Sequence, residues 1–233
     1  EIRKNMQYKF KTEPYEHQLE ALKRSWNKKE YAYFMEMGTG KSKVLIDNIS
    51  VLYDKGGINA AVIVAPKGVY RNWSEKEIPT HMPEHVLRQI AVWNPAPTKA
   101  QKKSLTDLFL PSDDLKILIV NVEAFSTKKG VTFVEKFILN HNCLIAVDES
   151  TTIKNPKAQR TKNLLKLAVN TKYRRILTGF PVTQSPLDLY SQSAFLSDQL
   201  LGYTSFYSFQ NRYAQLINRN MGARTFRQVI GYQ

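Results

Sequence analysis

The stretch Tyr31-Ala-Tyr-Phe-Met-Glu-Met-Gly-Thr-Gly-Lys-Ser42 decides the fold. Its first half is an aromatic, strand-like run, and apolar residues at helical spacing follow it from Val44 to Leu52. A strand, a glycine turn that ends in Gly-Lys-Ser and a helix are the context of a phosphate-binding loop. Backbone N–H groups of such a turn point into one concavity, where the helix dipole favours an anion. The sequence therefore predicts a nucleotide site on a parallel α/β sheet.

Each residue of the turn has an expected role in that site. Gly38 and Gly40 let the backbone pass close to phosphate oxygens without a Cβ in the way. Lys41 can reach the β- and γ-phosphates of ATP, and the Ser42 hydroxyl can ligate Mg²⁺. The strict pattern has glycine five residues before Gly40, where this chain has Met35. An ordinary strand–helix turn is the alternative that this departure leaves open.

A second nucleotide contact is expected on the helix that begins after Pro14. Its apolar stripe includes Leu19, Leu22 and Trp26, and Gln18 lies among them. A side-chain amide both donates and accepts, so Gln18 can pair with the N6 and N7 edge of adenine. The predicted nucleotide-binding residues are Gln18, Gly38, Thr39, Gly40, Lys41 and Ser42.

Composition and charge restrict the class of protein. Lys and Arg number 34 against 20 Asp and Glu, a net charge of +14 that favours a polyanionic partner such as nucleic acid. No apolar run approaches the length of a membrane span, so we expect no membrane association. The single cysteine, Cys143, excludes an internal disulfide and favours an intracellular, reducing compartment, either cytoplasm, nucleoid or nucleus.

Buried-type strands recur along the chain at 60–65, 115–120 and 143–147, with helical patterns between them, for example over 69–78. This alternation is typical of a parallel sheet with helices on both faces. Ligands bind at the carboxyl edge of such sheets. Residues 94–114 interrupt the rhythm and are expected to form a surface excursion with a basic helix.

The strand at 143–147 ends in the adjacent carboxylates Asp148 and Glu149. Two carboxylates at a strand terminus are costly unless positive charge lies opposite, and Mg²⁺ with a nucleotide on the phosphate loop would supply it. In that arrangement Asp148 holds the metal and Glu149 orients and deprotonates the attacking water. With Lys41, these two residues are the predicted catalytic groups, and Ser42 and Asp148 the predicted metal ligands.

The stretch Asp148-Glu-Ser-Thr-Thr-Ile-Lys-Asn155 resembles the second helicase motif of Swi/Snf-type (chromatin-remodeller-like) motors of helicase superfamily 2. Five more stretches match motifs of that family in its order: Gln18, 36–42, 64–73, 121–125 and 175–190. Departures are Phe180 for the usual Thr, Gln184 for Asn, and Ser150-Thr151 for Ala-His.

The resemblance implies a RecA-like lobe that binds ATP and Mg²⁺ and tracks double-stranded DNA. Nucleic-acid contacts would come from Lys67, Arg71, Ser126 and Lys154. Coupling between hydrolysis and DNA would pass through Thr178 and Gly179. The alternatives are a strand-separating DNA or RNA helicase, a restriction-enzyme motor subunit, and a scaffold module that binds ATP or DNA without catalysis.

The family hydrolyses ATP between two lobes, and the second supplies arginine fingers. Nothing after Pro181 resembles the finger motif, so the chain is expected to be the first lobe of a longer protein. The expected divisions are a basic arm over 1–13, the ATP-binding lobe over 14–198 and a basic segment over 199–233. This last segment has no Asp or Glu and would lead toward the second lobe.

Overall fold

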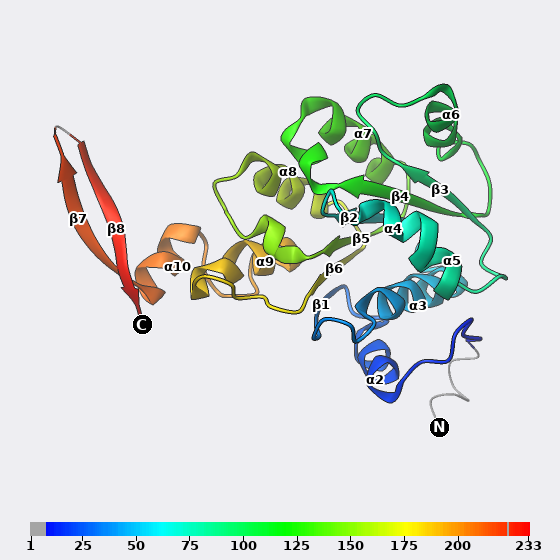
Figure 1. The fold of residues 1–233 in the computed structure, drawn as a ribbon, viewed down its shortest axis with the longest axis horizontal. Helices are drawn as coiled ribbons and strands as arrows, with labels where there is room; N and C mark the ends of the chain where they lie inside the picture. Colours follow the sequence, from blue (N-terminus) through cyan, green and yellow to red (C-terminus); the bar gives the residue numbers. More distant parts are fainter. Residues whose placement is uncertain (1–7, 223) are drawn as a thin grey trace.

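A six-stranded parallel sheet forms the centre of the molecule, with strand order β1-β6-β5-β2-β4-β3 (Figure 1). The computed structural model describes residues 8–222 and 224–233, so the first half of the predicted N-terminal arm lies outside the described residues. The strands are β1 (Glu30–Phe34), β2 (Ala60–Ala65), β3 (Arg88–Val92), β4 (Leu115–Asn121), β5 (Cys143–Asp148) and β6 (Tyr173–Thr178). The longer helices of the sheet region are α2 (Glu16–Ser25), α3 (Lys41–Asp54), α6 (Lys99–Asp107), α7 (Lys128–Leu139), α8 (Gln159–Ala168) and α9 (Leu189–Leu196).

Both faces of the sheet are covered, which confirms the predicted fold class. Every residue of β2 is buried, and alternate side chains of that strand enter two different cores. Val62 and Val64 pack in a core with residues of α7 and α8. Ala61 and Ile63 pack in a second core with residues of α2 and α3. This two-sided burial explains why the inner strands read as continuous apolar runs.

The helical pattern over 69–78 is not one regular helix. It divides into α4 (Tyr70–Asn72), a π-helical turn η1 (Trp73–Glu77) and α5 (Ile78–His81). Pro79 lies at the start of α5 and has no N–H to donate to the preceding turn, so continuous α-helical hydrogen bonding is interrupted there. Three short 3₁₀ turns occur along the chain: η2 (Val122–Ser126) after β4, η3 (Ser150–Ile153) after β5, and η4 (Pro186–Asp188) between β6 and α9.

The C-terminal part extends away from the sheet (Figure 1). It consists of α10 (Phe206–Tyr213) and an antiparallel hairpin of β7 (Ala214–Met221) and β8 (Arg224–Tyr232). A small apolar cluster that includes Leu187 and Phe209 joins the segment to the 3₁₀ turn η4. Among the described residues, no helix is long and apolar enough to cross a membrane.

Candidate nucleotide site

The loop between β1 and α3 has the backbone of an anion cradle. Gly38 and Gly40 both adopt left-handed conformations, with φ of 79° and 80°, and Gly40 is the residue before α3. The loop is closed by its own bonds, since the Thr39 hydroxyl donates to the carbonyl of Glu36 at 2.7 Å. The Lys41 ammonium donates to the carbonyls of Met35 and Glu36, each at 3.0 Å. Lys41 therefore lies over the loop and holds only neutral partners, which a phosphate can replace.

Gln18 is buried directly behind this loop rather than on the surface. Its side-chain nitrogen donates to the Thr39 carbonyl at 3.0 Å, and its oxygen accepts from the backbone N–H of Tyr15. A Cβ on Gly40 would lie 2.3 Å from the Gln18 side-chain nitrogen. The predicted adenine contact and the predicted phosphate loop are thus in direct contact, and a side chain at position 40 would displace the Gln18 amide.

The two carboxylates lie at the carboxyl end of β5. Asp148 accepts from the indole N–H of Trp73 at 3.1 Å and from the backbone N–H of Glu149 at 3.0 Å. Burial raises the pKa of Asp148 from 3.8 to about 6, and the neighbouring Glu149 carboxylate adds to the rise. The Trp73 hydrogen bond and the charge of Lys41 act in the opposite direction. A cation bound beside Asp148 would therefore stabilise its charged form.

Glu149 has a strained backbone that sets the direction of its side chain. Its φ of 48° makes it the one non-glycine residue with positive φ in the described part of the chain. Left-handed conformations of such residues are uncommon and cluster at functional sites. The carboxylate accepts from the Thr178 hydroxyl at 3.3 Å, at the end of the adjacent strand β6.

The residues predicted to couple hydrolysis to DNA lie between the two loops. Thr178 pairs with Phe34 across the β1–β6 ladder, and its carbonyl accepts from the N–H of Met35. A Cβ on Gly179 would lie 3.4 Å from Met37. The segment after β6 therefore touches the phosphate loop on one side and the Glu149 carboxylate on the other.

A buried glutamine joins the carboxylate turn to the segment after β6. The Ser150 hydroxyl donates to the side-chain oxygen of Gln192 at 2.6 Å, and the Gln192 amide donates to the carbonyl of Pro181 at 2.7 Å. Ser150 occupies the position where the family commonly has Ala, so this bond exists because of a departure from the family pattern. It ties the two segments by side-chain hydrogen bonds.

The residues predicted to contact nucleic acid fall into two groups. Lys67, Arg71 and Ser126 are exposed in the segments that follow β2 and β4, at the same edge as the nucleotide loop. Lys154 is different, because its ammonium donates to Thr183 at 2.7 Å and to Gln184 at 3.0 Å. Its charge also lies 3.6 Å from Asp188. We therefore expect Lys154 to order the segment after β6, and its contact with DNA stays a prediction.

A family model described as the SNF2-related domain matches residues 17–230 of the chain. The chain belongs to the SNF2-related domain family. This membership confirms the resemblance to Swi/Snf-type ATPases of helicase superfamily 2. The chain is 27% identical over 219 residues to "Protein CHROMATIN REMODELING 24" of Arabidopsis thaliana, an alignment that covers 91% of this chain and 19% of that protein. It is 29% identical over 162 residues to "Probable ATP-dependent DNA helicase CHR12" of the same plant, with 69% and 14% covered.

Solved structures show the same fold. The SWI2/SNF2 ATPase core of Sulfolobus solfataricus in complex with dsDNA matches with a TM-score of 0.69 at 24% identity, over 88% of this chain and 40% of that one. The UvsW helicase of bacteriophage T4 matches with a TM-score of 0.57 at 11% identity, over 79% and 58%. The SNF2-related domain described here spans less than a fifth of the two plant relatives.

The site of this SNF2-related domain has the donors and acceptors that Mg²⁺·ATP requires. A Cβ on the left-handed Gly38 would meet no atom within 4 Å, so the space beside this residue of the loop is open. The Ser42 hydroxyl has no hydrogen-bond partner among the described residues, and Asp148 lies at the same edge of the sheet, at the end of β5. Hydroxyl and carboxylate oxygens are the ligands that Mg²⁺ prefers. The residues present therefore fit the nucleotide and its metal.

Two residues of the matched motif stretches make contacts that the motifs themselves did not predict. Trp73 is buried, and its indole N–H donates to Asp148. Arg175 is fully buried at the start of the β6 motif and donates to the Asn48 side chain and to the backbone carbonyls of Ser25, Lys28, Lys29 and Arg174. The bonds from Trp73 to Asp148 and from Arg175 to Asn48 and Ser25 could not be read from spacing, because their partners lie far away in the sequence.

Proposed function

We propose that this chain is the ATP-binding first lobe of a motor that hydrolyses ATP with a second lobe and moves along double-stranded DNA. The observation that carries the proposal is the meeting of three elements at the carboxyl edge of adjacent strands β1, β6 and β5. The phosphate loop follows β1, Thr178 ends β6, and Asp148-Glu149 end β5. Membership of the SNF2-related domain family supports the same interpretation.

The protein's own groups divide the chemistry among them. Lys41 and the N–H groups of the loop bind phosphate oxygens, while Ser42 and Asp148 hold the metal. Glu149 accepts the proton of the attacking water, and its strained backbone and the Thr178 bond fix the direction of its carboxylate. When bound, Mg²⁺·ATP supplies the phosphoryl group and the charge that the loop neutralises. The Gln18 amide donates to the Thr39 carbonyl of the loop, and the adenine is proposed to bind beside it.

The rim of the site is suited to a second protein surface. Large apolar side chains are exposed on the residues that follow β1 and β6, with exposed fractions of 73% for Met37 and 63% for Phe180. Phe34, the last residue of β1, and Val182, after β6, are exposed as well. Exposed apolar groups around a polar site are typical of an interaction surface. We propose that the second lobe covers these apolar side chains. The second lobe would also supply the arginine finger, whose motif this sequence does not contain.

The DNA surface is proposed to lie along the segments after β2 and β4. Lys67 and Arg71 are exposed there, and Ser126 ends η2 just before α7. A motor that steps along any sequence holds phosphates rather than base edges, so affinity should fall steeply with salt and vary little with sequence. The buried thiol of Cys143 agrees with the intracellular, reducing compartment that we propose for the protein.

The experiment that tests the catalytic assignment is Glu149→Gln in the longer natural protein. We expect the variant to bind ATP with ordinary affinity and to hydrolyse it at near-background rate, because the base is lost while the metal ligand Asp148 remains. Glu135→Gln on α7 is the matched control and should leave turnover unchanged. Normal turnover by Glu149→Gln would reject the assigned role.

A further inference from the structure

A groove lies between α6 and α7, beyond the carboxyl end of β3 and outside the nucleotide site. It is open to solvent and has a volume of about 970 Å³, enough for several side chains of a bound ligand. α6 belongs to the surface excursion over 94–114, for which the proposed motor function gives no role. The groove is formed by residues of three segments: Trp93, Asn94 and Pro97; Lys102, Leu105 and Thr106; Lys128, Lys129, Thr132, Phe133 and Lys136.

The floor of the groove is apolar and aromatic. Trp93 and Leu105 are each only 6% exposed and belong to the core under the sheet. Phe133 is half-buried and packs edge-to-face against Phe109, with ring centroids 5.7 Å apart. Trp93 and Leu105 are held by the core beneath them, and Phe133 packs against that core. An apolar floor of this kind is suited to a large apolar side chain.

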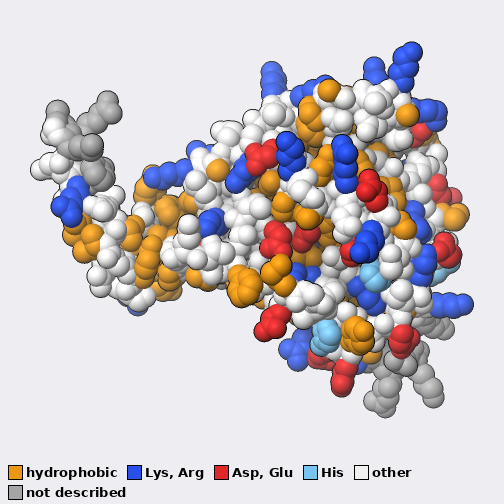
Figure 2. All heavy atoms as spheres, viewed as in Figure 1, with side chains coloured by type: hydrophobic (Ala, Val, Ile, Leu, Met, Phe, Trp, Pro, Cys, Tyr) orange, Lys and Arg blue, Asp and Glu red, His pale blue; other side chains and the backbone are white. Residues whose placement is uncertain are grey.

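The rim of the groove is basic. Lys102, Lys128, Lys129 and Lys136 are all exposed, and the described residues that line the groove include no acidic side chain. Within the described part of the chain, none of these four ammonium groups pairs with a carboxylate. Figure 2 shows Lys and Arg side chains projecting over the region of α6 and α7, with hydrophobic surface between them. The groove therefore has a positive rim around an apolar floor.

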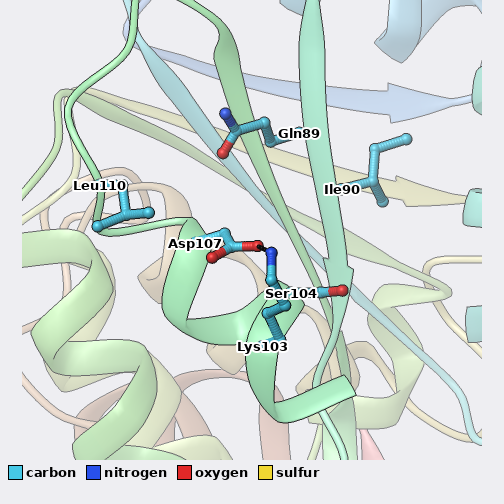
Figure 3. Close-up of a pocket in the computed structure, with 6 residues that line it drawn as sticks. All are labelled: Gln89, Ile90, Lys103, Ser104, Asp107 and Leu110. Carbon is cyan, nitrogen blue, oxygen red and sulfur yellow. Dashed lines mark hydrogen bonds and ion pairs between the residues drawn. The ribbon is translucent and has the colours of Figure 1, made fainter. Parts of the chain in front are cut away.

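The opposite side of α6 is built differently, which shows that the basic rim is not a general property of this helix. A smaller cavity of about 460 Å³ lies there between α6 and β3 (Figure 3). Its lysine, Lys103, is paired with Asp107 at 2.9 Å, and Gln89 bonds to Asp114 at 3.1 Å. The charges on that side are satisfied within the chain. Lys102, one residue earlier, faces the larger groove and has no such partner among the described residues.

We propose that the groove between α6 and α7 binds an acidic segment of a partner protein that inserts at least one large apolar side chain. Carboxylates of the segment would pair with the lysines on the rim, and its apolar side chain would cover Trp93, Leu105 and Phe133. Complementary charge provides specificity and on-rate, and a buried apolar anchor provides most of the affinity.

Duplex DNA is the weaker candidate for this groove, although Lys128 follows the proposed DNA contact Ser126 closely. The outer surface of a duplex presents phosphates and sugars, so it would leave the apolar floor uncovered. A second copy of the chain is disfavoured because each copy carries a net charge of +14. An acidic segment with an apolar anchor satisfies both parts of the groove.

The test is fluorescence anisotropy with a labelled short peptide of Asp and Glu that carries one Phe and one Leu at its centre. The double substitution Lys102→Glu with Lys136→Glu should weaken binding about tenfold or more, since two exposed attractions become repulsions. Lys103→Glu is the matched control on the same helix and should change affinity much less. A peptide with Ser in place of Phe and Leu should also bind much more weakly, and this arm requires no change to the protein.

Several results would overturn the proposal. The first is that the peptide does not bind. The second is that the rim variant and the Lys103→Glu control lose equal affinity for the peptide. The third is that the peptide with Ser in place of Phe and Leu binds as tightly as the original peptide. A short DNA duplex provides the last arm of the experiment. If it displaces the peptide and its own affinity falls in the Lys102→Glu with Lys136→Glu variant but not in Lys103→Glu, the groove belongs to nucleic acid.

Discussion

The substitution Asp148→Asn tests whether the nucleotide site holds a carboxylate whose charge is unfavourable when no metal is bound. In the folded chain burial raises the pKa of Asp148 from 3.8 to about 6. Below 3.8 the group is neutral in both folded and unfolded chains. Above about 6 it is charged in both, and the folded chain must then hold a buried charge. The wild-type protein therefore loses stability as pH rises through this window.

The rise from 3.8 to about 6 corresponds to about 3 kcal/mol. The amide introduced by Asp148→Asn would not titrate, so the variant should gain about that much stability relative to wild type between about pH 4 and about pH 8. The stability difference between variant and wild type at any one pH also includes the changed hydrogen bonds to Trp73 and Glu149. The variation of this stability difference with pH reports only the titration of Asp148, so this variation is the quantity to measure.

The assay is urea denaturation of both proteins across that pH range, without Mg²⁺ or nucleotide. Asp113→Asn, at an exposed loop position, controls for the loss of one negative charge. A stability difference between Asp148→Asn and wild type that is independent of pH would refute the reasoning. A difference that moves in the opposite direction would show that Asp148 is already neutralised by a partner within the chain.

Three other substitutions test the architecture of the site. Lys41→Ala should weaken ATP binding in calorimetry by about 2 kcal/mol or more while leaving the fold intact, because the ammonium bonds only to two loop carbonyls; unchanged affinity would remove this loop from the site. Gly40→Ala should lower the melting temperature more than Gly38→Ala. Both glycines have positive φ, but only a Cβ at Gly40 would meet Gln18. Equal decreases in melting temperature would contradict the close approach of Gly40 and Gln18. Arg175→Met should cost about 3 kcal/mol or more of unfolding free energy in urea, because buried carbonyls lose their donor; a neutral effect would show that those carbonyls find water.

The inner part of the fold could be predicted because its strands are buried on both faces. The run Ala60–Ala65 is apolar throughout, and its bounds agree with β2. The edge strand β3 gave no such signal, since its sequence is half polar and only Ala91 is buried. The hairpin of β7 and β8 was also missed, because exposed Arg, Asn and Gln alternate along it without a continuous apolar face.

The candidate site was predictable where the chemistry is local. A turn that ends in Gly-Lys-Ser and a carboxylate pair after an apolar strand are both contained in a few residues, and the sheet topology brings them to one edge. Contacts over long sequence distances could not be predicted. The Trp73 bond to Asp148 spans 75 residues, and the Lys154 contacts with Thr183 and Gln184 depend on the path of the segment after β6. The roles of these residues in catalysis and DNA binding stay predictions.

ATP hydrolysis by residues 1–233 compared with the longer natural chain tests the central claim most directly. An arginine finger is typically worth about 10³ to 10⁵ in rate, and no stretch of this sequence matches the family's finger motif. In a phosphate-release assay with double-stranded DNA, we expect near-background turnover by these residues alone and DNA-stimulated turnover by the longer chain. Lys41→Ala in the longer chain should abolish it. Equal, vigorous turnover by both proteins would contradict the proposal that this chain is one lobe of a two-lobe motor.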